Sequence, residues 1–186
     1  MRSVARPVLL LAVALLGLVS VVTPSSAATI DPCKVFTRAE VQRLLLGKKV
    51  VQVKHRDSAA THATECTWTT AFFQTKSFKR LRSGFALKLV FQPVATATSA
   101  LQDLRMKVRT PSDETTNTIP NLGNEAYSNF GSVIVVSGDL VLQVGATNYD
   151  TSAPPHPRVN DIARRAAVLV LARLASTPRS TTSPTR

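Results

Sequence analysis

The feature that most constrains the fold is the stretch of residues 31–47, which combines a cysteine with complete start and stop signals for one short helix. Thr37 and Glu40 have the spacing of a capping box, in which each side chain satisfies a backbone N–H at the helix start. Gly47 can adopt the left-handed conformation that ends a helix. An apolar face at helical spacing lies between these signals, made of Val41, Leu44 and Leu45. The folded domain is therefore predicted to begin here.

Residues 1–27 have the pattern of a secretory signal peptide. Arg2 and Arg6 precede an apolar run over residues 8–22, and small residues end at Ala27, where cleavage is expected. The apolar run is shorter than the roughly 20 residues of a transmembrane helix. We expect a secreted, extracytoplasmic protein of the cell envelope, and the alternative is an uncleaved signal anchor.

The length and charge of the chain limit its organisation and its partners. The 186 residues carry a formal net charge of +12. Residues 28–175 are long enough for a single domain with a substantial core, and the Ser/Thr/Pro-rich residues 176–186 are expected to be a disordered tail. Positive charge bears on partners rather than on fold. Outside the cytoplasm the anionic candidates are lipid headgroups, wall polymers and envelope proteins, and export disfavours nucleic acid.

The two cysteines, Cys33 and Cys66, are expected to form a disulfide, because an exported chain with an even number of cysteines usually oxidises them. The bridge would join the start of the capped helix to a strand that follows it. Closing a loop of about 34 residues is worth about 3.8 kcal/mol through the lost entropy of the unfolded chain.

Periodicity predicts three strands, a helix, a hairpin and a last helix after residue 47. The strands are expected over residues 48–55, 66–73 and 83–92, the helix over 95–108, the hairpin strands over 133–137 and 140–149, and the last helix over 157–175. Residues 56–65 and 110–118 have loop composition, and 119–130 hold too many turn formers for a regular element. We therefore expect an α+β fold, with an antiparallel sheet of about five strands and N-terminal, middle and C-terminal helices packed on it.

Several short motifs occur in a recognisable order along the chain. They are Asp31-Pro32-Cys33, Thr37 to Val41, Cys66-Thr67-Trp68, Leu122-Gly123 with Glu125-Ala126-Tyr127, the turn at Gly138 and the closing helix. Together they resemble the secreted and lipid-anchored envelope proteins of actinobacteria that are grouped as a domain of unknown function. The resemblance implies one extracytoplasmic domain with a bridge between Cys33 and Cys66, similar in fold to extracellular sensor domains, and no established activity. This chain lacks the lipidation cysteine of many such proteins and has Asn124 where they prefer Asp.

The best functional signal is a basic segment interleaved with aromatic residues. Its cations, Lys76, Lys79, Arg80 and Arg82, form a hypothetical binding site for an anionic partner. Phe72, Phe73 and Phe78 lie among them, and cations beside apolar rings suit a charged interface. Lys48, Lys49, Lys54 and Arg56 would join this surface if the first two strands pair. The alternative is that the rings are core and the charges only solvate a hairpin.

A second candidate is a ligand rim formed by Leu122, Gly123, Glu125 and Tyr127, because functional residues concentrate on loops held by a rigid scaffold. The structural alternative is a packed turn. In that interpretation Gly123 supplies an unusual backbone angle, while Leu122 and Tyr127 fill the core.

No motif specifies a reaction, a metal or a cofactor. His55, His62 and Cys66, or a set that includes Glu65, match no zinc spacing, and the cysteine is assigned to the disulfide. The chain has no nucleophile elbow or Ser-x-x-Lys pair, and Asp113-Glu114 lies in a polar loop. We therefore expect a non-enzymatic binding or accessory module that recognises an anionic or amphipathic envelope partner. The alternative is an envelope hydrolase or another enzyme with an unrecognised site.

Overall fold

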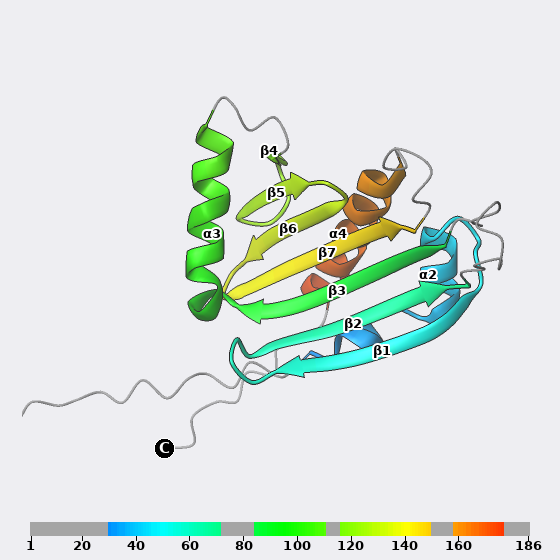
Figure 1. Cartoon of the computed structure of the whole chain (residues 1–186). Coiled ribbons are helices and arrows are strands. Elements are labelled where there is room, and N and C mark those ends of the chain that lie inside the picture. Colours follow the sequence, from blue (N-terminus) through cyan, green and yellow to red (C-terminus); the bar gives the residue numbers. More distant parts are fainter. Residues whose placement is uncertain (1–29, 72–83, 111–115, 150–157, 177–186) are drawn as a thin grey trace, which may run out of the picture.

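A seven-stranded antiparallel sheet forms the scaffold of the domain (Figure 1). The computed structural model describes residues 30–71, 84–110, 116–149 and 158–176. The strands are β1 (Val50–Ser58), β2 (Ala63–Thr70), β3 (Phe85–Pro93), β4 (Thr116–Thr118), β5 (Glu125–Asn129), β6 (Ser132–Ser137) and β7 (Leu140–Asn148). Their spatial order is β1-β2-β3-β7-β6-β5-β4, so β3 and β7 pair at the centre.

Helices cover the two faces of this sheet unequally. They are α1 (Pro32–Val35), α2 (Arg38–Leu44), α3 (Val94–Arg109) and α4 (Arg158–Ser176). The main core lies between one sheet face and α1, α2 and α4, and it contains Trp68, Leu89 and Val144 from the strands and Val41 and Val170 from the helices. On the opposite face α3 packs on the β4 to β7 side of the sheet, in a smaller apolar cluster with residues of β5, β6 and β7. The part of that face over β1, β2 and β3 carries no described helix (Figure 1).

The α+β class and the three helical regions are confirmed, but the sheet has seven strands rather than about five. The additional strands are β4 and β5, which lie in stretches predicted as a loop and as turn-rich chain. Both are short, and β4 consists of the polar residues Thr116–Thr118. Hydrogen bonding to a neighbouring strand decides their conformation, and a single-sequence pattern does not carry that information.

The pairing of β1 with β2 is closer to the sequence prediction, and it is longer than expected. The register runs from Val50↔Thr70 to Ser58↔Ala63, with a bulge between Val50 and Gln52. Residues 56–58 and 63–65, predicted as loop, therefore belong to strands. The backbone pairing between the two strands continues through these residues, although their polar composition is typical of a loop.

The N-terminal segment forms two helices instead of one. The capping box is present, with Thr37 and Glu40 each accepting from the other's backbone N–H. Leu46 and Gly47 both have positive φ, at 58° and 76°, and the Gly47 N–H donates to the Gln42 carbonyl at 2.7 Å, which closes the helix end. The disulfide Cys33–Cys66 is confirmed, and it ties the short α1 to β2.

The hairpin between β6 and β7 forms at the predicted turn. Gly138 has a φ of +62°, while Asp139 has no positive φ, as a type II′ turn requires. None of the described helices is long and apolar enough to cross a membrane. The predicted signal peptide, the tail beyond residue 176 and the basic segment Lys76, Lys79, Arg80 and Arg82 lie outside the described residues.

Removal of both cysteines, as Cys33→Ala with Cys66→Ala, is expected to lower the free energy of unfolding by about 3.8 kcal/mol, because the unfolded chain regains the entropy of a loop of about 34 residues. Urea unfolding of the oxidised wild type, the reduced wild type and the double variant measures this loss. Reduction should reproduce the variant. Equal stability of oxidised and reduced protein would contradict the expectation.

Arg173, in the last turn of α4, fastens this helix to the N-terminal segment. Its guanidinium donates to the Val35 carbonyl and to the Glu40 carboxylate, and it lies 5.4 Å from the centre of the Phe36 ring. Arg173, followed by the backbone and side chain of Thr37, lowers the pKa of Glu40 from 4.5 to about 2. Glu40 therefore stabilises the fold more as a carboxylate than as an acid.

Because the pKa of Glu40 is lower in the folded state, its contribution is complete above pH 4.5 and is lost as the pH falls towards 2. Glu40→Gln should therefore be less stable than wild type at pH 6. The difference in the free energy of unfolding between the two proteins should become smaller below pH about 4.5. Urea unfolding at a series of pH values measures it. A difference that is constant down to pH about 2.5 would refute this assignment.

Candidate functional site

The open sheet face over β1 and β2 carries a block of polar side chains. Alternation along β2 puts Cys66 and Trp68 in the core and leaves Glu65, Thr67 and Thr69 on the open face. Each has a cross-strand neighbour on β1. The pairs are Gln52 with Thr69, Lys54 with Thr67, and Arg56 with Glu65.

These six side chains line a shallow hollow of about 400 Å³. Tyr149, which follows β7, closes one side of it, and its backbone N–H donates to the Gly84 carbonyl at 2.8 Å. The hollow therefore lies on the outer surface of the sheet and is not a cleft between layers. Its lining offers cationic, hydroxyl, amide and phenolic groups, which can hydrogen-bond an extended polar ligand.

Positive charge dominates the hollow. The acidic side chain in it, Glu65, forms an ion pair with Lys88 of β3 at 2.6 Å. Partial burial acts to raise the pKa of Glu65, but the hydrogen bond and charge of Lys88, the Thr67 hydroxyl and the charge of Arg56 hold it below its ordinary value. Among the described residues no acidic group forms an ion pair with Lys54 or Arg56.

The sequence singled out Lys54 and Arg56 on the condition that the first two strands pair, and the pairing meets that condition. Lys48 and Lys49 precede β1 and are exposed. Lys76, Lys79, Arg80 and Arg82 lie outside the described residues, so their role stays a prediction. The described residues next to this segment are Ala71, which follows β2, and Gly84, which precedes β3.

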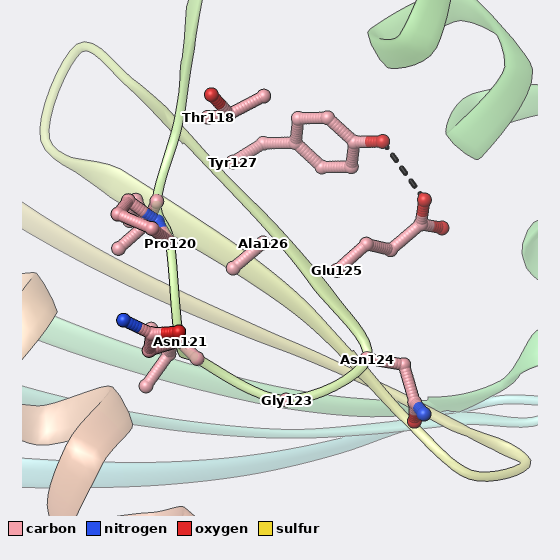
Figure 2. A pocket seen from close by; sticks show the side chains of 10 residues that line it. Thr118, Pro120, Asn121, Gly123, Asn124, Glu125, Ala126 and Tyr127 are labelled. Atoms are coloured by element: carbon pink, nitrogen blue, oxygen red, sulfur yellow. Dashed lines mark hydrogen bonds between the residues drawn. The ribbon is translucent and has the colours of Figure 1, made fainter.

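The loop predicted as a ligand rim packs closely against β6. Gly123 has a φ of +66°, and a Cβ at this position would lie 2.5 Å from both the Val135 side chain and the Val136 carbonyl. Asn124 turns away from the loop (Figure 2), accepting at 2.7 Å from the Gly138 N–H. Leu122 packs against the main core. The backbone here is determined by contact with the sheet, and only glycine fits at Gly123.

The other two residues of that loop belong to a network with α3. The Glu125 carboxylate accepts from Arg105 at 2.5 and 3.1 Å and from the Tyr127 hydroxyl at 2.9 Å, and Figure 2 shows the two side chains of β5 directed to the same side. Tyr127 is buried in the cluster beneath α3. Glu125 therefore fixes α3 and is already fully engaged. Whether this loop is also a ligand rim stays a prediction.

The network shifts the pKa of both acidic members. The hydrogen bond from Arg105 is the main cause that lowers the pKa of Glu125. Burial and then the hydrogen bond to Glu125 raise the pKa of Tyr127 above 10. A neutral phenol donating to a carboxylate is a stable arrangement at neutral pH and does not act as a base. A hollow of about 250 Å³ along residues 118–127 adds no further titratable group.

The described residues contain no group of three or more His, Cys, Asp or Glu side chains placed to hold a metal ion. His55 pairs with Asp57 at 3.0 Å, and Cys66 is in the disulfide. Sequence reasoning missed Thr67, Thr69 and Lys88 as site residues and considered Glu65 only as a metal ligand. The alternation of β2 and β3 was the available signal, because it assigns these side chains to the face opposite Trp68 and Leu89.

Comparison with known proteins returns no matching family model, no curated relative and no similar solved structure.

The raised pKa of Tyr127 can be observed directly. The chain has two tyrosines, so in a Tyr149→Phe variant the tyrosinate absorbance reports Tyr127 alone. We expect its midpoint above pH 10, and Glu125→Gln should shift it down because the negative acceptor is lost. The folded state favours the neutral phenol, so its stabilisation is present below pH 10 and is lost at higher pH. A midpoint at or below 10 would contradict this network.

Proposed function

We propose that this protein is a secreted, non-enzymatic binding module of the cell envelope, whose open sheet face holds an anionic partner. The observation that supports it is the hollow over β1 and β2, where neither Lys54 nor Arg56 forms an ion pair with a described residue and the one acidic side chain, Glu65, is paired with Lys88. The signal-peptide pattern and the disulfide agree with work outside the cytoplasm. The resemblance to actinobacterial envelope proteins remains part of this proposal.

The chemistry of the hollow favours a polymer with carboxylate or phosphate groups. Lys54 and Arg56 provide charge, and Gln52, Thr67 and Thr69 provide hydrogen bonds to the uncharged parts of such a chain. The hollow is shallow and lies on a sheet face, so it suits an extended chain laid across the strands. A small ligand that binds tightly would need a deeper, more apolar pocket. An acidic wall polymer therefore fits better than a small molecule.

The alternative function, an envelope hydrolase, has no specific observation in its favour. Catalysis needs a carboxylate or histidine that meets a nucleophile or a water. In the described residues Glu65 is engaged by Lys88 and Thr67, and Glu125 by Arg105 and Tyr127. These hydrogen bonds and ion pairs position the two carboxylates and stabilise their charge, and they do not orient a reacting group.

The test is binding of the exported, processed protein to a polyuronate and to a polyglycerol phosphate, with neutral dextran as reference. Lys54→Ala with Arg56→Ala should weaken binding to the anionic polymers by about 2-fold to 30-fold, since exposed charge contacts contribute about 0.2–1 kcal/mol each. Binding should weaken further at high salt.

The matched control removes two exposed cations from α2, as Arg38→Ala with Arg43→Ala, and should leave binding nearly unchanged. A variant with Lys76, Lys79, Arg80 and Arg82 all changed to Ala tests separately whether the basic segment takes part. Binding that the Lys54/Arg56 variant retains in full would assign the anionic partner to another surface.

A further inference from the structure

The outer face of α4 has an unusual composition for a helix that closes a core. Its inner face is fully buried through Ala163, Ala166 and Val170. The outer face carries exposed residues at helical spacing, namely Asp161, Arg164, Arg165, Val168, Leu169 and Ala172. Val168 is 48% exposed and Leu169 is 43% exposed. The helix therefore has a second apolar strip, one turn after a pair of arginines.

An exposed aromatic residue lies beside the first turn of this helix. Phe130, in the turn between β5 and β6, is 74% exposed and has a φ of 34°. Positive φ is uncommon for a bulky residue and is a reason to look for function. The turn is fixed by the pairing of Asn129 with Ser132 and by the contacts of Gly131, and the ring of Phe130 is exposed.

Two contacts place this turn against α4, and a third ties it to β7. The Gly131 N–H donates to the Asn160 side chain at 2.6 Å, and the Gly131 carbonyl accepts from the Ala146 N–H at 2.7 Å. A Cβ on Gly131 would lie 2.6 Å from Val159. At about 1.5 Å per residue, Asn160 and Val168 are about 12 Å apart along the helix. Because Asn160, Arg164 and Val168 are four residues apart, they lie along one side of the helix. The turn that carries Phe130 therefore lies at the N-terminal end of this side, and Arg164 and Arg165 lie between it and the strip of Val168 and Leu169.

We propose that this surface, defined by Phe130, Arg164, Arg165, Val168 and Leu169, docks on an anionic lipid bilayer. Apolar side chains beside cations on one helical face are the pattern of helices that lie in a membrane interface. The arginines would meet lipid phosphates while the apolar side chains enter the headgroup boundary. The inference is independent of the polymer site, since α4 lies on the sheet face opposite the hollow.

Charge complementarity favours a bilayer over a second copy of this chain. Two copies docked through this surface would bring together four arginines, and only Asp161 of each copy would offset them. Arg164 and Arg165 form no ion pair with another described residue. A single convex helix face also lacks a groove for a partner's anchor, whereas it can rest on a lipid surface.

The test is co-sedimentation of the exported, processed protein with vesicles of phosphatidylglycerol and phosphatidylcholine, and with phosphatidylcholine alone. We expect binding only to the anionic vesicles, weakening at high salt. Arg164→Ala with Arg165→Ala should weaken it about 30-fold, and Val168→Ser with Leu169→Ser or Phe130→Ser alone should also weaken it severalfold. Arg164→Lys with Arg165→Lys should bind like wild type, because lipid attraction needs charge and not the planar guanidinium.

Matched variants separate this surface from others. Met106→Ser removes an exposed apolar residue from α3 and should have no effect, and Arg38→Ala with Arg43→Ala controls for net charge. Lys54→Ala with Arg56→Ala should retain vesicle binding. The vesicle and polymer experiments therefore test the two proposals separately, and either proposal can fail without the other. In a Phe130→Trp variant, bromine-labelled lipid should quench the fluorescence of the new tryptophan, while that of the buried Trp68 should not be quenched.

Three outcomes would overturn the proposal. They are no binding to anionic vesicles, equal binding by the wild type and the Arg164/Arg165 variant, and loss of binding in the lysine variant, which would point to a specific protein site for the two guanidinium groups. Far-UV circular dichroism and an intact disulfide confirm that each variant is folded.

Discussion

The pairing of β3 with β7 is the interaction on which the rest of the structure depends. It runs from Phe85↔Asn148 to Pro93↔Leu140 and joins two halves that are each built from sequence neighbours. One half is β1-β2-β3 and the other is β4 to β7, with α3 crossing between them. At one end the Val94 N–H donates to the Asp139 carbonyl at 2.8 Å, so the start of α3 is tied to the β6–β7 turn. The hollow, the α3 cluster and the α4 contact all require this central ladder.

Two local contacts then secure the helices against the sheet. The disulfide holds α1 on β2, and Arg173 holds the end of α4 on the α1–α2 segment through Val35, Glu40 and Phe36. Both act at the end of the sheet where β1 is an edge strand. Because β1 pairs with no described strand other than β2, the N-terminal helices and their two attachments protect the core on that side. The glutamate that caps α2 is the same residue that anchors α4, which couples a local helix signal to tertiary packing.

Local signals predicted local structure well. The capping box of Thr37 and Glu40, the turn at Gly138 and the amphipathic stripes of α3 and α4 each depend on residues close in sequence. The disulfide followed from two cysteines and the expected compartment. Strand β5 was not predicted, because its conformation depends on pairing with β6 and not on the turn-forming residues around it.

The site was less predictable, for a related physical reason. Arg105 and Glu125 lie on different elements, and the ion pair between them requires α3 to lie over β5. Glu65 and Lys88 form an ion pair because of the register in which β2 and β3 pair, and this register cannot be read from the sequence alone. Lys54 and Arg56 were proposed only if β1 and β2 pair. Residue types and charge can thus be read from a sequence, whereas their partners depend on register and on which sheet face each helix covers.

The unequal cover of the sheet is the physical reason for expecting two binding surfaces. Helix α3 follows β3 directly, and its tie to the β6–β7 turn places it over β5 to β7, so it cannot also cover β1 and β2. Those strands carry polar side chains on their open face, as a surface in contact with water requires. On the other face α4 is broad enough to bury its inner side and still present Arg164, Arg165, Val168 and Leu169 outward. The two proposals together give the domain a cationic surface on each side of one sheet, so that it would hold two anionic structures at once.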